Sequence, residues 1–139
     1  VSDANTFFIE TVLKFHRIDN CFSEIFSNRA NFDASGKMKI LPFHATAQLC
    51  GRCPPNLCKG KILESIKNNG SNSSHSVIYI GDGSGDFCPI TGLNYSDRVF
   101  ARTSKCKEYG LEKMVRENAS VLLKAKFIKW DSYERLQWE

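Results

Sequence analysis

The sequence predicts an α/β fold. A short, β-branched apolar run over residues 77–80 predicts a buried strand. This run ends at a glycine-rich turn that carries two carboxylates. In α/β sheets, ligands bind beyond the carboxyl ends of the strands, so this turn is the first candidate for a functional site. Segments with helical periodicity and further short apolar runs follow each other along the rest of the chain.

The other elements are predicted from local patterns. Residues 6–16 carry Phe7, Phe8, Val12 and Phe15 mainly on one helical face. Residues 37–41 alternate polar and apolar side chains, as an edge strand does. In chain order we expect a helix over 6–16, a helical turn over 19–26, a hairpin over 31–43 that turns at 34–36, a helix from Pro54-Pro55 to about Lys67, a polar loop over 68–74, a short helix at 88–90, strands over 97–101 and 124–128 with a helix over 105–117 between them, and a closing helix over 131–138.

The composition is that of one soluble globular domain, assigned to residues 1–139. The chain is 42% hydrophobic and 24% charged, and no apolar run approaches the roughly 20 residues of a membrane span. The formal net charge of +4 is spread along the chain. This charge suits a small anionic substrate but provides no basic stripe. We therefore expect neither nucleic acid nor a membrane as a partner.

Six cysteines allow either disulfides or reduced thiols. No export signal is visible in the sequence and the apolar content is sufficient for a core, so we expect reduced thiols in a cytoplasmic protein. Cys50, Cys53 and Cys58, with His44 as a fourth ligand, also fit a structural zinc site. The alternative is that these cysteines are small packed thiols under a loop.

The glycine-rich turn contains Asp82 and Asp86, four residues apart. Two hard oxygen donors on one tight turn suit Mg²⁺, which takes one or two protein carboxylates and completes its shell with water and phosphate oxygens. Glycines let a ligand approach the backbone of such a turn closely. The alternative is an ordinary surface Asp-Gly turn after a core strand.

The first residues of the chain also carry polar side chains at a helix start. Asp3 or Asn5 can cap the helix that begins near Thr6. The hydroxyl of Ser2, beside this helix N-terminus, is suited to bind a phosphoryl oxygen. The alternative is that these residues serve only as caps.

Three ordered motifs resemble haloacid dehalogenase (HAD) type phosphatases, most closely the plant members of the phosphoethanolamine/phosphocholine phosphatase branch, which include pyrophosphate-specific enzymes. They are Val1-Ser2-Asp3-Ala4-Asn5, Cys53-Pro54-Pro55-Asn56-Leu57-Cys58-Lys59-Gly60, and Gly81-Asp82-Gly83-Ser84-Gly85-Asp86-Phe87-Cys88-Pro89. The resemblance implies a Rossmann-like three-layer HAD core with a parallel sheet. It also implies a Mg²⁺-dependent phosphatase acting on small phosphate monoesters or pyrophosphate.

The resemblance assigns roles to six residues. It implies that Asp82 binds Mg²⁺ directly and that Asp86 assists, either directly or through a water molecule. Ser2 and Lys59 hold the phosphoryl group, with Lys59 favoured over Lys61, which is expected at the surface. Asp3 and Asn5 face the substrate.

The nucleophile of the resembled mechanism lies in an Asp-x-Asp motif on the first strand, and this sequence contains no such motif. We therefore expect an N-terminally truncated core, without the nucleophile strand and most of the cap region, and with an open strand edge in its sheet. Two functions follow as alternatives: the C-terminal part of an active phosphatase, or a catalytically silent module that binds phosphate or Mg²⁺. A third alternative is a small zinc-stabilised binding domain.

Overall fold

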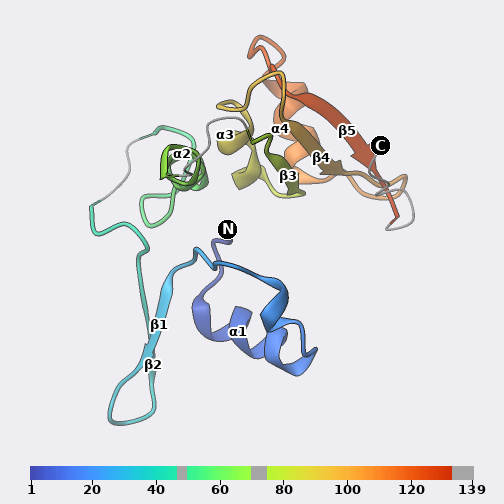
Figure 1. Ribbon diagram of the computed structural model, residues 1–139. Coiled ribbons are helices and arrows are strands. Elements are labelled where there is room, and N and C mark those ends of the chain that lie inside the picture. Colours follow the sequence, from blue (N-terminus) through green and yellow to red (C-terminus); the bar gives the residue numbers. More distant parts are fainter. Residues whose placement is uncertain (47–49, 70–74, 133–139) are drawn as a thin grey trace. The chain divides into compact units, whose positions relative to one another are not determined.

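The computed structural model describes residues 1–46, 50–69 and 75–132 of the chain (Figure 1). These residues divide into two compact units, Val1–Ile62 and Leu63–Glu139. Each unit is considered by itself below. Most of the predicted closing helix at 131–138 and most of the polar loop at 68–74 lie outside the described residues.

The N-terminal unit contains one helix, one short 3-10 helix and a hairpin among its described elements before α2. They are α1 (Thr6–Phe15), η1 (Asp19–Cys21), β1 (Arg29–Phe32) and β2 (Met38–Leu41). The predicted cap of α1 is confirmed, because Oδ1 of Asn5 accepts a hydrogen bond from the backbone N–H of Phe8 at 3.2 Å. Preceding residues 1–4 form no strand; a single parallel bridge joins Asn5 to Asn28.

The predicted hairpin is confirmed. β1 and β2 pair antiparallel, with Arg29 opposite Leu41 and Phe32 opposite Met38. The carboxylate of Asp33 organises the turn by accepting hydrogen bonds from the N–H groups of Ser35 and Lys37 at 3.0 and 3.1 Å. Gly36 has φ +80°, a conformation that glycine adopts without steric cost.

Helix α2 (Lys59–Asn69) begins later than predicted. Pro54 and Pro55 lie in a turn before the helix rather than in its first turn. The segment between them and the helix includes Leu57 and Cys58, which are both buried. Lys59 is thereby the first residue of α2.

The C-terminal unit is an α/β structure around a three-stranded parallel sheet, as predicted. Its remaining elements are β3 (Ile78–Gly81), η2 (Ser84–Asp86), α3 (Phe87–Ile90), β4 (Arg98–Arg102), α4 (Gly110–Glu117) and β5 (Lys126–Trp130). The order of the strands is β3-β4-β5, with Ile78 beside Arg98 and Val99 beside Phe127 (Figure 1). Helix α4 packs against β4.

The core of this unit is apolar and lies between the sheet and the helices. Its buried members are Leu63, Phe87, Ile90, Leu93, Val99, Ala101, Leu111 and Ala125. Helix α4 begins five residues later than predicted, at Gly110. The residues just before it are held in a loop, where the Arg102 guanidinium lies over the ring of Tyr109 at 5.1 Å.

The prediction that 77–80 is a buried strand is wrong for one of its faces. Ile78 and Ile80 are 43% and 49% exposed, whereas the central residues of β4 are buried. Ile78 and Ile80 share one face of β3, an edge strand of the described sheet, whereas Tyr79 on the other face packs against the core. A continuous apolar run cannot distinguish an edge strand from a central one.

Asp97 is 1% exposed and joins three segments of the C-terminal unit. Its carboxylate accepts hydrogen bonds from Val77 N and Asn94 N, both at 2.8 Å. It also pairs with the Lys67 ammonium at 2.8 Å. Burial raises the pKa of the Asp97 carboxyl, but these donors outweigh burial and hold that pKa below its ordinary value.

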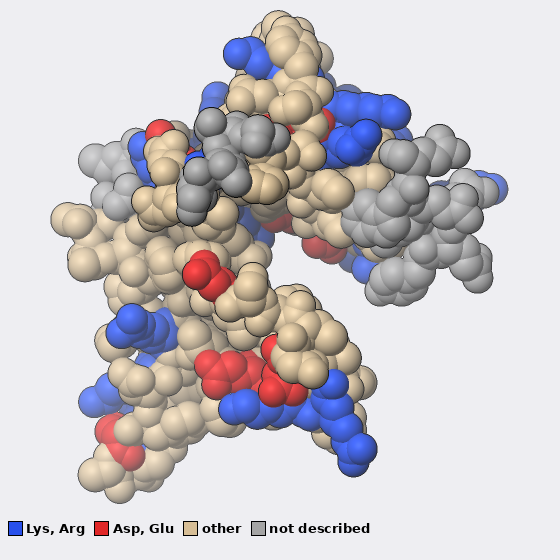
Figure 2. All heavy atoms as spheres, viewed as in Figure 1, with Lys and Arg blue, Asp and Glu red and all other residues tan. Residues whose placement is uncertain are grey.

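No described helix combines the length and the hydropathy needed to cross a bilayer. Basic and acidic side chains occur side by side on the face of the N-terminal unit seen in Figure 2. Two such pairs are Lys14 with Glu10 and Lys39 with Asp33.

Replacing Asp97 by Asn is expected to lower the free energy of unfolding by about 2–4 kcal/mol at pH 7, because Lys67 loses its buried partner. The lowered pKa means that the carboxylate stabilises the fold fully above about pH 4 and loses this effect as the pH falls through the folded-state pKa. Urea unfolding of both proteins at several pH values should therefore show their difference shrinking in acid. The surface variant Glu117→Gln, which removes an exposed pair with Lys113, should change stability by less than about 0.5 kcal/mol. A difference between wild type and Asp97→Asn that does not vary with pH would contradict this account.

Candidate active site

The acidic turn, residues 81–86, begins at the carboxyl end of β3, includes η2 and leads directly into α3. Asp82 is exposed directly after the strand, whereas Asp86 is 5% exposed. The two carboxylates predicted to act together therefore have different environments. They also have different structural tasks.

The buried carboxylate of Asp86 is used to shape the turn. Its Oδ2 accepts hydrogen bonds from the N–H groups of Asp82 and Gly83, at 3.0 and 2.9 Å. Its Oδ1 accepts a hydrogen bond from the hydroxyl of Tyr79 at 2.8 Å. A buried charge requires such partners, and here they fix the backbone that carries Asp82.

Two glycines allow this packing. A Cβ atom at Gly81 would lie 2.7 Å from Cγ of Asp86, too close for any side chain. A Cβ atom at Gly110, the first residue of α4, would lie 2.5 Å from the backbone N of Ser84. The next residue of α4, Leu111, donates its backbone N–H to the carbonyl of Asp82 at 3.0 Å. The acidic turn is thus held by Asp86 from within and by the start of α4 from outside.

The donor set at this turn fits Mg²⁺. Asp82 is fixed through its main chain on both sides, and its exposed side chain offers hard carboxylate oxygens to solvent. Mg²⁺ binds such sites with few protein ligands and several waters. The oxygens of Asp86 already accept backbone and phenol hydrogen bonds, and its supporting role toward a metal stays a prediction.

The N-terminal unit brings together two other predicted site residues. Nζ of Lys59, at the first position of α2, lies 3.9 Å from Oδ1 of Asp3. The Lys59 side chain is 12% exposed, whereas the Asp3 side chain is 60% exposed. Lys61 is exposed, as expected.

Ser2 and Asn5 lie on either side of Asp3. Oγ of Ser2 accepts a hydrogen bond from Ala4 N at 3.2 Å, and Ser2 N donates to Phe26 O at 3.0 Å. Asn5 is buried and uses its side-chain oxygen as the α1 cap. The roles of Ser2, Asp3, Asn5 and Lys59 toward a substrate remain predictions, as does their convergence with the acidic turn.

Sequence reasoning missed Asn28, which is buried and organises the N-terminal unit. Its Nδ2 donates to the carbonyls of Asp3 and Ala4, both at 3.0 Å. Its Oδ1 accepts from Phe43 N at 3.1 Å and from Nδ2 of Asn56 at 3.4 Å. Nothing in the local sequence distinguishes this asparagine from a turn residue, because its partners are 15 to 28 positions away.

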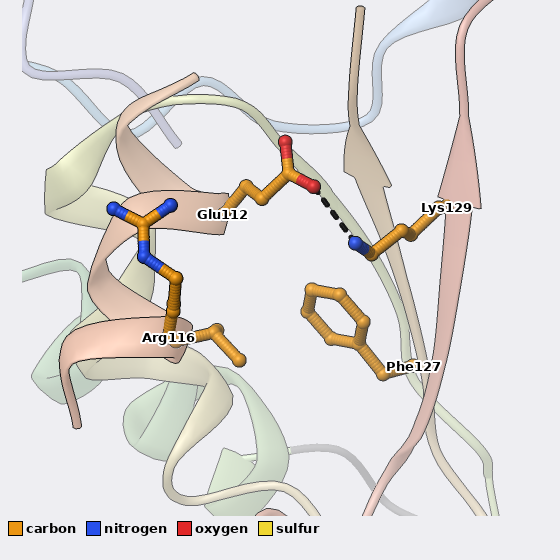
Figure 3. A pocket seen from close by; sticks show the side chains of 5 residues that line it. Glu112, Arg116, Phe127 and Lys129 are labelled. Atoms are coloured by element: carbon orange, nitrogen blue, oxygen red, sulfur yellow. Dashed lines mark hydrogen bonds and ion pairs between the residues drawn. The ribbon is translucent and has the colours of Figure 1, made fainter. Parts of the chain in front are cut away.

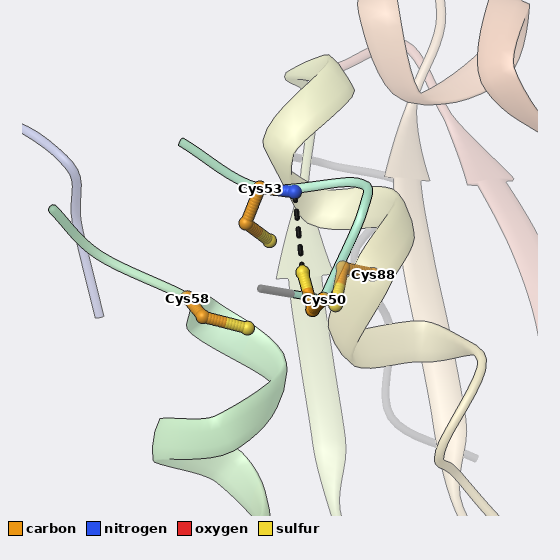
Figure 4. A group of neighbouring side chains, drawn as sticks. All are labelled: Cys50, Cys53, Cys58 and Cys88. Atoms are coloured by element: carbon orange, nitrogen blue, oxygen red, sulfur yellow. Dashed lines mark hydrogen bonds between the residues drawn. The ribbon is translucent and has the colours of Figure 1, made fainter. Parts of the chain in front are cut away.

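A second cluster in the N-terminal unit consists of Cys50, Cys53 and Cys58, drawn in Figure 4 together with Cys88 of the other unit. The Sγ atoms of the three thiols lie within 4.8 Å of one another. The pKa of Cys50 is lowered to about 7. The largest cause is a hydrogen bond from the backbone of Arg52, opposed by burial and reinforced by the backbone of Cys53. His44, proposed from the sequence as a fourth metal ligand, is outside this group.

The C-terminal unit also has a pocket of about 290 Å³ between α4 and β5 (Figure 3). Its lining includes Glu112, Arg116 and Lys129. Glu112 pairs with Lys129 at 2.7 Å, and Arg116 pairs with Glu108. Each basic side chain of the lining is paired with an acidic one. The pocket therefore has little net positive charge with which to attract a phosphate.

Replacing Gly81 by Ala is expected to displace Asp86 and lower the free energy of unfolding by about 1–3 kcal/mol, since the added methyl overlaps a locked side chain. The matched control is Gly92→Ala, whose Cβ would meet its nearest neighbour, Pro89 O, at an ordinary 3.7 Å. Urea unfolding of both variants measures the difference. Equal stability of the two would contradict the described packing of the turn.

Comparison with known proteins gives the family. The family model described as "Putative Phosphatase" matches residues 1–138. A thiamine phosphate phosphatase-like protein of Arabidopsis thaliana is 42% identical over 142 residues, which cover 99% of this chain and 56% of that protein. Inorganic pyrophosphatase 1 of the same plant is 38% identical, covering 99% and 47%. The human phosphoethanolamine/phosphocholine phosphatase is 35% identical, covering 84% and 43%.

The chain thus spans about half the length of these curated relatives. No solved structure matches it. The family model covers nearly the whole chain, and the α/β unit with its acidic turn agrees with the motifs that resemble HAD phosphatases. The chain belongs to this family of HAD-type phosphatases.

Proposed function

We propose that this chain forms part of a Mg²⁺-dependent phosphatase that hydrolyses small phosphate monoesters or pyrophosphate through an aspartyl-phosphate. The observation that carries the proposal is the acidic turn, in which a buried Asp86 fixes the backbone and leaves the Asp82 carboxylate exposed at the end of β3. The attacking aspartate of this mechanism belongs to an Asp-x-Asp motif that the present sequence does not contain. We therefore assign this chain the metal and phosphoryl-binding groups of the reaction.

The acidic turn supplies the metal ligands. Asp82 would hold Mg²⁺ directly, and Asp86 would keep the turn rigid and assist the metal site. When bound, Mg²⁺ offsets the repulsion between an anionic nucleophile and the phosphoryl oxygens. A turn fixed before the substrate arrives costs little reorganisation during the reaction.

The N-terminal unit supplies the phosphoryl-binding groups. Lys59 would place its ammonium against the phosphoryl oxygens, and its partial burial strengthens that attraction compared with an exposed lysine. Ser2 would donate its hydroxyl to the same oxygens. Asp3 lies 3.9 Å from Lys59, so it would orient the ammonium while facing the substrate.

The substrate class is proposed from the names of the relatives. They name thiamine phosphate, inorganic pyrophosphate and phosphoethanolamine/phosphocholine, which share a terminal phosphoryl group on a small molecule. The residues assigned above contact that shared group. We therefore propose phosphocholine, phosphoethanolamine or pyrophosphate as substrates.

We also propose a cytoplasmic location, which agrees with six cysteines in the thiol form.

The second candidate is a catalytically silent module that binds phosphate or Mg²⁺. Its supporting observation is the missing Asp-x-Asp motif. Turnover separates the two candidates: binding of inorganic phosphate that depends on Mg²⁺, without hydrolysis of pyrophosphate or phosphocholine, would favour the silent module.

In the phosphatase of which this chain is proposed to form part, Asp82→Asn is expected to reduce hydrolysis of pyrophosphate or phosphocholine at least about 100-fold, because an amide is a poorer Mg²⁺ ligand than a carboxylate. The Asp82 side chain is exposed, so the melting temperature should change little. Initial rates measured across a Mg²⁺ titration test the prediction. Unchanged rates in a folded variant would remove Asp82 from the metal site.

In the same phosphatase, Lys59→Gln is expected to reduce kcat/KM about 10- to 1000-fold, because the ammonium that stabilises phosphoryl charge is lost. Lys61→Gln is the matched control, two positions along the same helix but exposed. Its kcat/KM should stay within about twofold of wild type. If the two variants lose activity equally, the assignment of Lys59 fails.

A further inference from the structure

The three-thiol cluster, Cys50, Cys53 and Cys58, has no role in the proposed phosphatase chemistry. Its members come from two segments, the turn over residues 50–53 and the residue before α2. Cys58 is 1% exposed, and the other two are partly buried. Their sulfur atoms nevertheless point toward one another and lie within 4.8 Å (Figure 4).

The geometry of the 50–53 turn is specific. Gly51 follows Cys50 and has φ +71°, a left-handed conformation that residues other than glycine rarely adopt. The turn brings the backbone N–H of Cys53 to 3.2 Å from Sγ of Cys50. Backbone N–H groups that donate to cysteine sulfur favour the thiolate, which is the form that binds metals.

We propose that Cys50, Cys53 and Cys58 bind one thiophilic metal ion, with zinc as the physiological ion. Zinc binds thiolates at about 2.3 Å, so the sulfurs of a tetrahedral site lie roughly 3.8 Å apart. The sulfur atoms therefore need to approach one another by at most about 1 Å to reach that spacing. Binding releases the thiol protons to solvent and leaves one position of the tetrahedron for a fourth group.

The chemistry of the donors separates this site from the acidic turn. Soft thiolates select zinc over Mg²⁺, whereas carboxylate oxygens at Asp82 select Mg²⁺. The proposed site also differs from the sequence-based version, because the cluster excludes His44. Nε2 of His44 is buried without a hydrogen-bond partner among the described residues, and its ring packs against Phe43.

The proposed ion would fix the start of α2. Cys58 directly precedes Lys59, which is the first residue of α2. Joining Cys58 to the 50–53 turn through a metal would restrain the backbone from which Lys59 projects. This consequence, which rests on the proposed function, would make the three cysteines positioning residues for the phosphoryl-binding lysine.

The test is metal analysis of the protein purified without added chelator, by inductively coupled plasma mass spectrometry. About one zinc per chain is expected for wild type, and bound zinc should fall about tenfold or more in Cys50→Ser and Cys53→Ser. Cys21→Ser and Cys106→Ser are matched controls at exposed cysteines outside the cluster, and they should retain zinc. If a cluster variant fails to fold, the wild-type protein is loaded with Co²⁺ instead. Thiolate-to-cobalt charge-transfer absorption is then the expected result.

Two results would overturn the proposal. One is wild-type protein that contains no zinc and takes up no Co²⁺ at its thiols. The other is a disulfide between two of the three cysteines in that protein, found by mass spectrometry after alkylation. Asp82→Asn should retain full zinc content even where hydrolysis is lost, so failure of the phosphatase assignment and failure of the thiol site are separate outcomes.

Discussion

The carboxylate of Asp86 is the buried charge around which the acidic turn forms. Removing such a group from water costs several kcal/mol unless it is hydrogen-bonded, and three donors surround it here. Those bonds set the path of the chain after β3 and require a residue without a side chain at Gly81. The exposed position of Asp82, and hence the proposed metal site, follows from this one buried group.

A second buried carboxylate, Asp97, acts at the opposite end of the same strand. Asp97 accepts the N–H of Val77 just before β3, and Asp86 accepts two N–H groups just after it. β3 lies at the edge of the described sheet and has two half-exposed isoleucines, so burial alone holds it weakly. The ionic hydrogen bonds at its two ends compensate, and they fix the strand and the acidic turn that follows it.

Patterns within a few residues of each other were predictable from the sequence. The hairpin and the cap at Asn5 depend on local periodicity and turn chemistry, and the structure confirms them. The parallel sheet is implied by the resemblance to HAD phosphatases, and the structure confirms it as well. The exposure of β3 depends on which strands lie beside it. The bonding of Asn28 depends on distant segments, and so does the thiol cluster without His44. Local sequence does not encode these long-range contacts, although the spacing of the cysteines indicated that three of them could meet.

The close approach of Gly110 to Ser84 has a consequence for engineering this protein. Considered only as the first residue of a helix, Gly110 invites replacement by alanine, since alanine has the higher helix propensity. The backbone of Ser84 occupies the space that the methyl group would need. Programmes that stabilise proteins by exchanging glycines in helices would therefore damage the acidic turn from a position 26 residues beyond Ser84, and residue 110 should be held fixed in any such library.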